Sequence, residues 1–248
     1  MEVIVLGGSG TFPRAGGACN GFLVREGDTN VLLDIGTGVL SRLYQWLDPG
    51  KLEALIITHL HPDHFLDLYP YRYFLEFQAR ERLPLPVFAP VGAADHIRPL
   101  FNEPDTSKFD RIFKFTDLVS DEPFTIGGLT ITPRPVPHLD PTYGIEAAAE
   151  GRRLFYTSDT DFSESLVSYS AGVDLLLAET TLRAEDADVP VAHMTTTQVA
   201  DLAERARVGR LVLTHLWPHF DRFQIKHEVA RGFNGRIDLA DEGLLIKV

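Results

Sequence analysis

Residues 54–64 read Ala-Leu-Ile-Ile-Thr-His-Leu-His-Pro-Asp-His, an apolar run followed at once by three histidines and an aspartate. The run 54–58 is short and rich in β-branched residues, which predicts a buried strand. The histidine cluster then lies on a loop at the end of that strand. Loops held by a rigid scaffold are where functional residues concentrate, so the stretch predicts a site at a sheet edge.

The residue types in this loop point to a metal. Imidazole nitrogens and carboxylate oxygens suit zinc, with iron, nickel and manganese as further possibilities. His59 and His61 can project to the same side of a strand end, and a turn at Pro62 can bring Asp63 and His64 back towards them. A solvated polar loop is the alternative, and the density of ligating residues argues against it.

Ligands confined to one short loop do not complete a metal site, so others must come from elsewhere in the chain. Three candidates each follow a predicted strand. His138 comes after Pro135-Val136-Pro137, Asp159 lies in Tyr156-Thr157-Ser158-Asp159-Thr160, and His215 follows Leu211-Val212-Leu213-Thr214. All three therefore occupy the same kind of position as the first cluster.

The rest of the pattern predicts one α/β domain over residues 1–248, with two mixed sheets inside and helices outside. Helices are expected at Val39–Leu47, Tyr69–Arg82, Thr196–Ala206 and Gln224–Phe233. Strands are expected at Glu2–Leu6, Gly21–Arg25, Val31–Asp34, Ala54–Thr58, Val87–Ala89, Leu129–Val136, Gly144–Ala149, Arg153–Thr157, Asp174–Ala178, Arg210–Thr214, Arg236–Leu239 and Gly243–Val248.

Composition limits the partners. The chain has 248 residues, 44% of them hydrophobic, and its 23 basic and 35 acidic side chains give a net charge of −12. Such a charge opposes binding to a large nucleic acid, although bound cations still allow a small anionic substrate. No apolar stretch reaches membrane-spanning length and the N-terminus lacks a signal-peptide pattern, so we expect a cytoplasmic protein without membrane contact. The single Cys19 excludes an internal disulfide, and a homodimer is one open possibility.

The order His-X-His-X-Asp-His, followed by His, Asp and His, resembles the metallo-β-lactamase superfamily of hydrolases over essentially the whole chain. Leu6-Gly7-Gly8-Ser9-Gly10 and Leu32-Leu33-Asp34-Ile35-Gly36 also look like its opening segments. The resemblance implies a four-layer αββα fold and two divalent ions, with Zn²⁺ expected first and Mn²⁺, Fe²⁺ or Ni²⁺ as alternatives. It assigns one ion to His59, His61 and His138, the other to Asp63, His64 and His215, and a bridging position to Asp159.

A finer resemblance concerns the catalytic residues. Ala178-Glu179-Thr180-Thr181 and Ala192-His193-Met194-Thr195-Thr196 are similar to segments of the ribonuclease Z branch and its small phosphodiesterase relatives. The resemblance implies a general acid at His193, oriented by Glu179, acting beside the metal ligand Asp63. The alternative is that His193 is merely a polar residue before a helix capped by Thr195 or Thr196.

The resemblance favours a phosphodiesterase that cleaves small phosphodiesters such as cyclic nucleotides through a metal-bridging hydroxide. Segments 213–216 and 241–243 are similar to bacterial cyclic-nucleotide phosphodiesterases of an atypical metallo-β-lactamase-like group. Three alternatives remain: a ribonuclease Z-type transfer-RNA 3′ endonuclease, a lactonase or thioesterase using the same dinuclear centre, and a metal-binding module without turnover.

Ribonuclease Z-type enzymes carry an arm that grips transfer RNA, typically between the segments matching His138 and Asp159. Here these residues are only 21 positions apart, and Pro62 stands where ribonuclease Z usually has glycine. Asp34 could orient a ligand imidazole, as such carboxylates commonly do. Asp161 has no role that the sequence indicates.

Overall fold

The computed structural model describes residues 1–102, 105 and 107–248. Its strands form two seven-stranded sheets, with the orders β14-β1-β2-β3-β4-β5-β6 and β13-β12-β11-β10-β9-β8-β7. The first sheet contains β1 (Glu2–Gly7), β2 (Gly21–Glu26), β3 (Thr29–Leu33), β4 (Ala54–Ile56), β5 (Leu85–Ala89), β6 (Phe113–Asp117) and β14 (Leu245–Lys247). The second contains β7 (Phe124–Ile126), β8 (Leu129–Pro135), β9 (Tyr143–Ala149), β10 (Arg152–Tyr156), β11 (Leu175–Glu179), β12 (Arg210–Thr214) and β13 (Arg236–Leu239).

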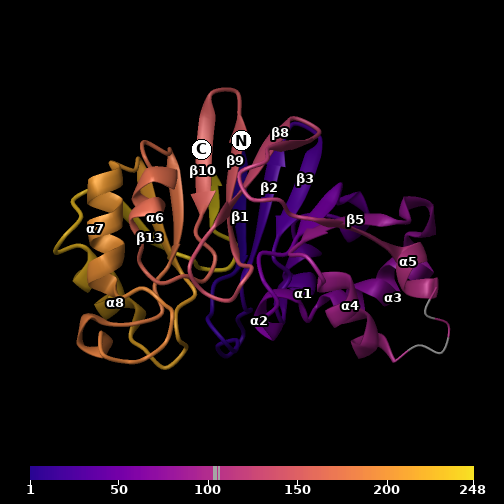
Figure 1. Cartoon of the computed structure of the whole chain (residues 1–248), viewed down its shortest axis with the longest axis horizontal. Helices are drawn as coiled ribbons and strands as arrows, with labels where there is room; N and C mark the ends of the chain where they lie inside the picture. Colours follow the sequence, from indigo (N-terminus) through magenta and orange to yellow (C-terminus); the bar gives the residue numbers. More distant parts are fainter. Residues whose placement is uncertain (103–104, 106) are drawn as a thin grey trace.

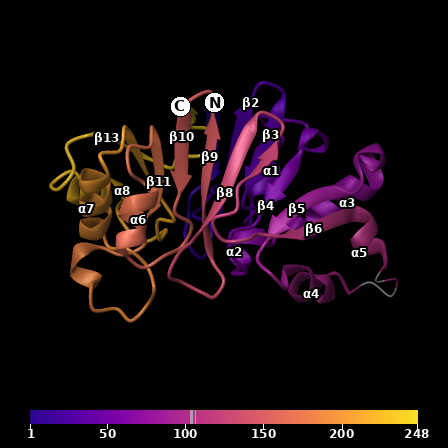
Figure 2. The ribbon, with the colours of Figure 1, turned by 45° about the horizontal axis from the view of Figure 1, so that its top comes forward.

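Helices cover the outer faces of both sheets (Figures 1 and 2). Helices on the side of the first sheet are α1 (Val39–Leu43), α2 (Pro62–Phe65), α3 (Leu68–Gln78), α4 (Ala93–Ile97) and α5 (Ser107–Ile112). Helices on the side of the second sheet are α6 (Glu164–Tyr169), α7 (Thr196–Ala206) and α8 (Arg222–Val229). This four-layer arrangement of two mixed sheets between helices confirms the fold class predicted from the sequence.

Strand alternation explains the layers. In β1, Val3 and Val5 belong to the hydrophobic core between the sheets, whereas Ile4 and Leu6 pack in the core beneath the outer helices. Both faces of the strand are therefore buried, as expected for a sheet covered on each side. A third core lies between the second sheet and its helices, where β11 contributes Leu176 and Ala178.

Parallel pairing determines where the strand ends meet. Strands β3 to β6 run parallel to one another, and so do β10 to β13. The carboxyl ends of parallel strands lie at one edge of a sheet, which is where ligand sites form in α/β folds. The segments that follow β4, β10 and β12 are consequently brought to the same end of the molecule.

Several elements differ from the sequence-based expectation. Strands β6 and β7 and the short helices α2, α4, α5 and α6 were not predicted. The first helix ends at Leu43 rather than Leu47, and the last long helix ends at Val229 rather than Phe233. Helices this short have little intrinsic stability and form because one face packs on a sheet, which local periodicity does not reveal.

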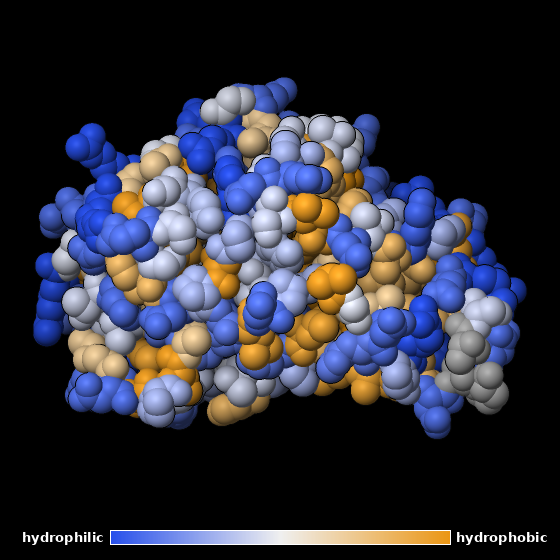
Figure 3. All heavy atoms as spheres, in the orientation of Figure 1, coloured by the Kyte–Doolittle hydropathy of each residue, from blue (hydrophilic) through white to orange (hydrophobic). Residues whose placement is uncertain are grey.

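The surface is polar over most of the face seen in Figure 3, where hydrophobic spheres occur in separate patches between hydrophilic ones. Among the residues that the structure describes, no helix is long and apolar enough to cross a membrane.

Candidate metal centre

The structure brings together all seven residues proposed as metal ligands. Their potential ligand atoms fall within 4.8 Å of one another in two groups, His59, His61, His138 and Asp159 in the first and Asp63, His64 and His215 in the second. A third group of this kind joins Asp159 and His215 to His193. The loop after β4 and helix α2 supply four of the seven, and loops of the second sheet supply the other three. Both sheets therefore contribute to one cluster.

Hydrogen bonds at Nδ1 orient four of the imidazoles. Nδ1 of His138 lies 2.9 Å from the carbonyl oxygen of Ala192, which can only accept, so this nitrogen carries the proton. Nδ1 of His64 lies 2.8 Å from Asp34 Oδ2, and Nδ1 of His59 and His215 lies 3.1 and 2.7 Å from threonine hydroxyls. This leaves the Nε2 lone pair of each ring free, as metal-ligating histidines require.

Buried atoms without hydrogen-bond partners show that the cluster fits cations. Nε2 of His59, Nε2 of His64 and Oδ1 of Asp159 are buried and make no hydrogen bond to any described residue. His61 Nδ1 also lies 3.2 Å from His138 Nε2. Buried polar atoms are almost always satisfied in folded proteins, so this convergence favours ions as the missing partners.

The charges of the site support the same assignment. Burial lowers the pKa of His59, His61 and His138, which keeps these rings neutral and able to coordinate. Burial alone would raise the pKa of Asp159, but the charges of His215 and His64 outweigh it and hold that pKa well below its usual value. The neutral rings of His59, His61 and His138 beside the ionised Asp159 suit a divalent ion, whereas the charges of Asp159 and Asp34 outweigh burial and raise the pKa of His64.

Asp159 has the position expected of a bridge between the two groups. Its Oδ2 lies 3.2 Å from His215 Nε2 and 3.6 Å from His59 Nε2, and its Oδ1 lies 3.3 Å from His64 Nε2. Oδ2 therefore faces one imidazole from each group, and Oδ1 faces an imidazole of the second group. This is the arrangement required for a ligand shared by two ions.

Asp34 forms hydrogen bonds that hold the loop after β4 and the His64 ring in place. Its Oδ2 lies 2.8 Å from His64 Nδ1 and accepts hydrogen bonds from Tyr156 Oη at 2.9 Å and Thr58 Oγ1 at 3.0 Å. All four side chains are fully buried. The contact with His64 agrees with the orienting role proposed for Asp34 from the sequence, while the tyrosine and threonine contacts were not foreseen.

The backbone is strained around the ligands. Asp34, Ser158 and His215 have φ values of 56°, 55° and 53°, in the left-handed region that non-glycine residues seldom occupy. Gly36 is required for close approach, because a Cβ there would lie 1.9 Å from the backbone oxygen of Asp63. Such strain is characteristic of functional sites and persists only when the surrounding structure enforces it.

His193 lies at the edge of the cluster, on the loop before α7. Its ring stacks on that of His215 with centroids 5.3 Å apart, and its Nδ1 lies 2.8 Å from Glu179 Oε1. Burial alone would lower the pKa of His193, but the hydrogen bond to Glu179 and the charge of that residue raise it overall. Thr195 does cap α7, through a capping box with Gln198, so the helix start is explained without His193.

Thr181 connects the His193–Glu179 pair to the candidate ligand His215. Its Oγ1 donates to Glu179 Oε2 at 2.8 Å and lies 2.7 Å from Nδ1 of His215, whose proton it can accept. The sequence placed Thr181 beside Glu179 but indicated no role for it. The Thr181 hydroxyl is fully buried between Glu179 and the candidate ligand His215. This contact depends on the folding of the chain and could not be predicted from the sequence.

We expect Thr181→Val to weaken metal binding by about 10–100-fold. Valine keeps the shape of the side chain, but the His215 ring loses its hydrogen bond at Nδ1 and Glu179 Oε2 loses one hydrogen-bond donor. Metal titration followed by calorimetry measures the change. Thr180→Val is the matched control, since the Thr180 hydroxyl is equally buried but bonds only to the backbone oxygen of Ala178. Equal losses in both variants would contradict the role given to Thr181.

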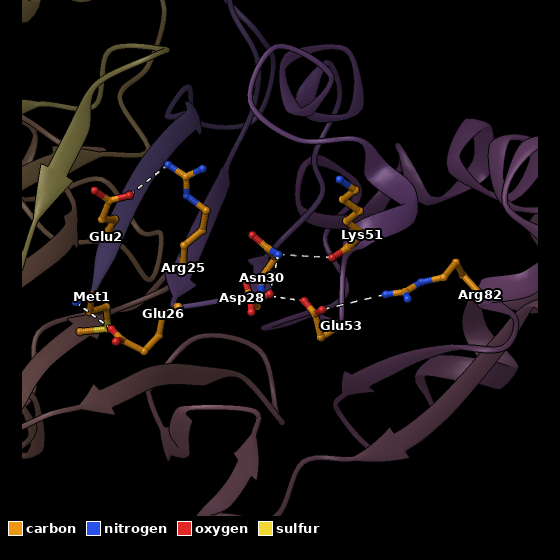
Figure 4. A pocket seen from close by; sticks show the side chains of 10 residues that line it. Met1, Glu2, Arg25, Glu26, Asp28, Asn30, Lys51, Glu53 and Arg82 are labelled. Carbon is orange, nitrogen blue, oxygen red and sulfur yellow. Dashed lines mark hydrogen bonds and ion pairs between the residues drawn. The ribbon is translucent and has the colours of Figure 1, made fainter.

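A hollow of about 510 Å³ lies at the end of the first sheet that is opposite to the candidate metal centre (Figure 4). It is lined by the amino ends of β3 and β4, whereas the candidate ligands follow carboxyl ends. Glu2 is paired there with Arg25, and Glu53 with Arg82. None of its lining residues is a histidine, so this hollow is separate from the metal centre.

A sequence profile described as the beta-lactamase superfamily domain matches residues 29–216, well over half of the chain. The chain belongs to this family. The probable metallo-hydrolase YhfI of Bacillus subtilis is 30% identical over 252 residues, which cover 99% of each protein. The crystal structure of YhfI superposes with a TM-score of 0.89 at 28% identity, over 99% of this chain and 98% of that one. Membership of this family and the ligand cluster identify a metal-dependent hydrolase.

Other similar proteins differ in the activities that their names state. A ribonuclease Z of Mycobacterium bovis is 29% identical over 271 residues, which cover 98% of this chain and 96% of that protein. A diphosphatase of the PhnP family has a TM-score of 0.78 at 19% identity, over 100% of this chain and 97% of that one. The second likeness concerns the fold alone, and neither comparison identifies the substrate of this metallo-hydrolase.

Proposed function

We propose that this metallo-hydrolase is a phosphodiesterase that cleaves small phosphodiesters such as cyclic nucleotides. It binds two divalent ions, for which we expect zinc first. The observation that carries the proposal is the His193–Glu179 pair at the edge of the ligand cluster, with Nδ1 of His193 held 2.8 Å from Glu179 Oε1. A hydrolase that cleaves a poor leaving group needs such a proton donor.

The ligand set supports a phosphorylated substrate. Divalent ions held by the seven residues would act as Lewis acids towards a phosphoryl oxygen and towards water. The donors are five imidazoles and two carboxylates, Asp63 and Asp159, so the carboxylates leave positive charge on two such ions. An anionic phosphodiester is attracted by that local charge even though the chain as a whole carries −12.

The chain's own groups can move the required proton. Because Glu179 accepts from Nδ1 of His193, the proton delivered to the leaving oxygen is the one on Nε2. Glu179 stays in place because its Oε1 also accepts from the backbone of Thr160 at 3.0 Å and its Oε2 from that of Thr181 at 3.1 Å. The pair is therefore ordered before substrate binds, as efficient general acid catalysis requires.

The segment between His138 and Asp159 supports a small substrate. It contains strands β9 and β10, whose registered pairing from Ile145 with Tyr156 to Ala149 with Arg152 occupies most of the interval. Strand β9 also pairs with β8, so this hairpin belongs to the sheet. The interval therefore has no room for an inserted transfer-RNA arm.

We expect the metal-loaded protein to hydrolyse bis(p-nitrophenyl) phosphate and cyclic AMP with a kcat/KM at least about 100-fold above that for precursor transfer RNA at physiological salt. A lactone and a thioester should be poor substrates in the same panel. Efficient and accurate 3′ processing of the precursor would instead favour the ribonuclease Z alternative. We include this alternative because the chain is similar to a ribonuclease Z of M. bovis. Hydrolysis of the lactone or thioester alone would contradict the phosphodiesterase assignment, and no turnover at all would favour a binding module.

A further inference from the structure

A cavity of about 480 Å³ opens beside His193. Its walls come from the loop before α7, which contributes Val189, Pro190 and Val191, and from Leu182 after β11. Its polar lining includes Asp161 and Gln198. A volume of this order accommodates a nucleoside-sized molecule, and a lining that mixes polar groups with a few apolar side chains suits a sugar.

Asp161 is placed by the same segment that builds the metal centre. Asp159 is the candidate bridge, the N–H of Thr160 donates to Glu179 at 3.0 Å, and the N–H of Asp161 donates to the carbonyl oxygen of Pro137 at 2.8 Å. These bonds fix the backbone of Asp161 at the edge of the site. Its Oδ1 accepts from the N–H of Phe162 at 2.7 Å, while Oδ2 has no hydrogen-bond partner among the described residues.

Gln198 is oriented in a similar way. Its Oε1 accepts from the N–H of Thr195 at 2.8 Å and from the Thr195 hydroxyl at 3.1 Å. The side-chain oxygen is thus committed to the start of α7, and the amide NH₂ group remains as a donor in the cavity lining. One acceptor and one donor therefore line the cavity beyond the proton-donating histidine.

We propose that this cavity holds the leaving alcohol of the substrate and that Asp161 Oδ2 accepts hydrogen bonds from its hydroxyl groups. The inference rests on the proposed function and adds to it the chemical class of the leaving group, a ribose-like polyol. In the reaction, the oxygen of a water molecule forms a bond to phosphorus as the P–O bond to the alcohol breaks. The alcohol oxygen takes the proton from Nε2 of His193, and the proton lost by the water passes to solvent, from which His193 is protonated again. The alcohol must then lie on the side of His193, which is where this cavity is.

The charge of Asp161 decides which leaving groups are accepted. A carboxylate can accept from two neighbouring hydroxyls at once, whereas it repels a phosphate or carboxylate. The cavity therefore favours an uncharged sugar over one that carries a further phosphate in addition to the one being cleaved. The apolar part of the lining, at Leu182, Val189, Pro190 and Val191, suits the face of a base attached to that sugar.

The test uses binding, so that it does not depend on turnover. Adenosine and 2′,3′-dideoxyadenosine are titrated into the metal-loaded wild-type protein, Asp161→Asn and Asp188→Asn, with affinities measured by calorimetry. Asparagine at 161 keeps an oxygen for the N–H of Phe162 and removes the charge, while the exposed Asp188 lies on the loop before α7, outside the cavity lining. We expect wild type and Asp188→Asn to bind adenosine about tenfold more tightly than the dideoxy compound, and Asp161→Asn to lose most of that difference.

Failure of this inference and failure of the proposed function give different results. Equal affinity for the two nucleosides in wild type, no binding of either, or unchanged discrimination in Asp161→Asn would overturn the inference, even if phosphodiesters are hydrolysed. Discrimination that depends on Asp161 in a protein unable to hydrolyse any phosphodiester would preserve the cavity assignment and overturn the proposed function. Melting temperatures of the three proteins confirm that all are folded.

Discussion

Asp159→Ala should lose both bound ions and reduce phosphodiester hydrolysis by at least about 10³-fold. The carboxylate faces His59, His64 and His215 at 3.2–3.6 Å, so its removal takes a ligand from both groups at once. Metal polarisation contributes several kcal/mol to reactions of this kind, and each 1.4 kcal/mol corresponds to about tenfold in rate. Elemental analysis of the purified variant and kcat/KM for bis(p-nitrophenyl) phosphate measure the two effects.

The control for this variant is Asp188→Ala, which removes an exposed carboxylate outside the cluster. It should retain close to two ions per chain and full activity. If active wild-type protein contains one ion or none, the dinuclear assignment is wrong. If Asp159→Ala keeps both ions, Asp159 is not the bridge.

His193→Ala should lower the turnover of a substrate with an alkoxide leaving group by about 10²–10⁴-fold, the usual contribution of general acid catalysis. Release of p-nitrophenolate should fall less than about tenfold, because that leaving group needs little protonation. Metal content should not change, since the seven other residues supply the ligands. Turnover of cyclic AMP and of bis(p-nitrophenyl) phosphate, measured beside elemental analysis, gives all three quantities.

Two further variants separate catalysis from structure. Glu179→Gln should show a weaker form of the same selectivity, because it removes the charge that stabilises protonated His193. His219→Ala, at an exposed imidazole outside the cluster, should leave both substrates unaffected. Equal losses on both substrates, or loss of metal in His193→Ala, would exclude His193 as the general acid.

The strands that precede the candidate ligands were predicted correctly from the sequence, whereas strand β6 at the edge of the first sheet was not. The strand before His59 and the strands before Asp159 and His215 have clear apolar runs, and the structure contains all three. Strand β6 was missed although Phe113 and Phe115 alternate with polar residues, since a run this short also fits a loop. Its strand character comes from parallel pairing with β5, a contact with a segment far away in the chain.

The same distinction applies to the site. The candidate ligands that the structure brings together were proposed from local motifs and family resemblance, because they follow predicted strands, although Asp63 and His64 lie in α2. The supporting contacts could not be predicted, since they join distant residues through buried hydroxyls. Ser158 donates to Thr58 across 100 positions at 2.8 Å, and Tyr156 donates to Asp34 across 122. No periodicity or spacing rule identifies such partners.

Because the two sheets each hold only part of the ligand set, cation binding and folding are thermodynamically linked. An ion that contacts residues of both sheets binds the native chain and has no equivalent site in the unfolded one, so it shifts the unfolding equilibrium by mass action. At a free metal concentration 100 times the dissociation constant, one such site adds about 2.7 kcal/mol to the free energy of unfolding. The metal ions would then also link the two sheets to each other. The concentration of free metal would therefore affect the fraction of the protein that is folded.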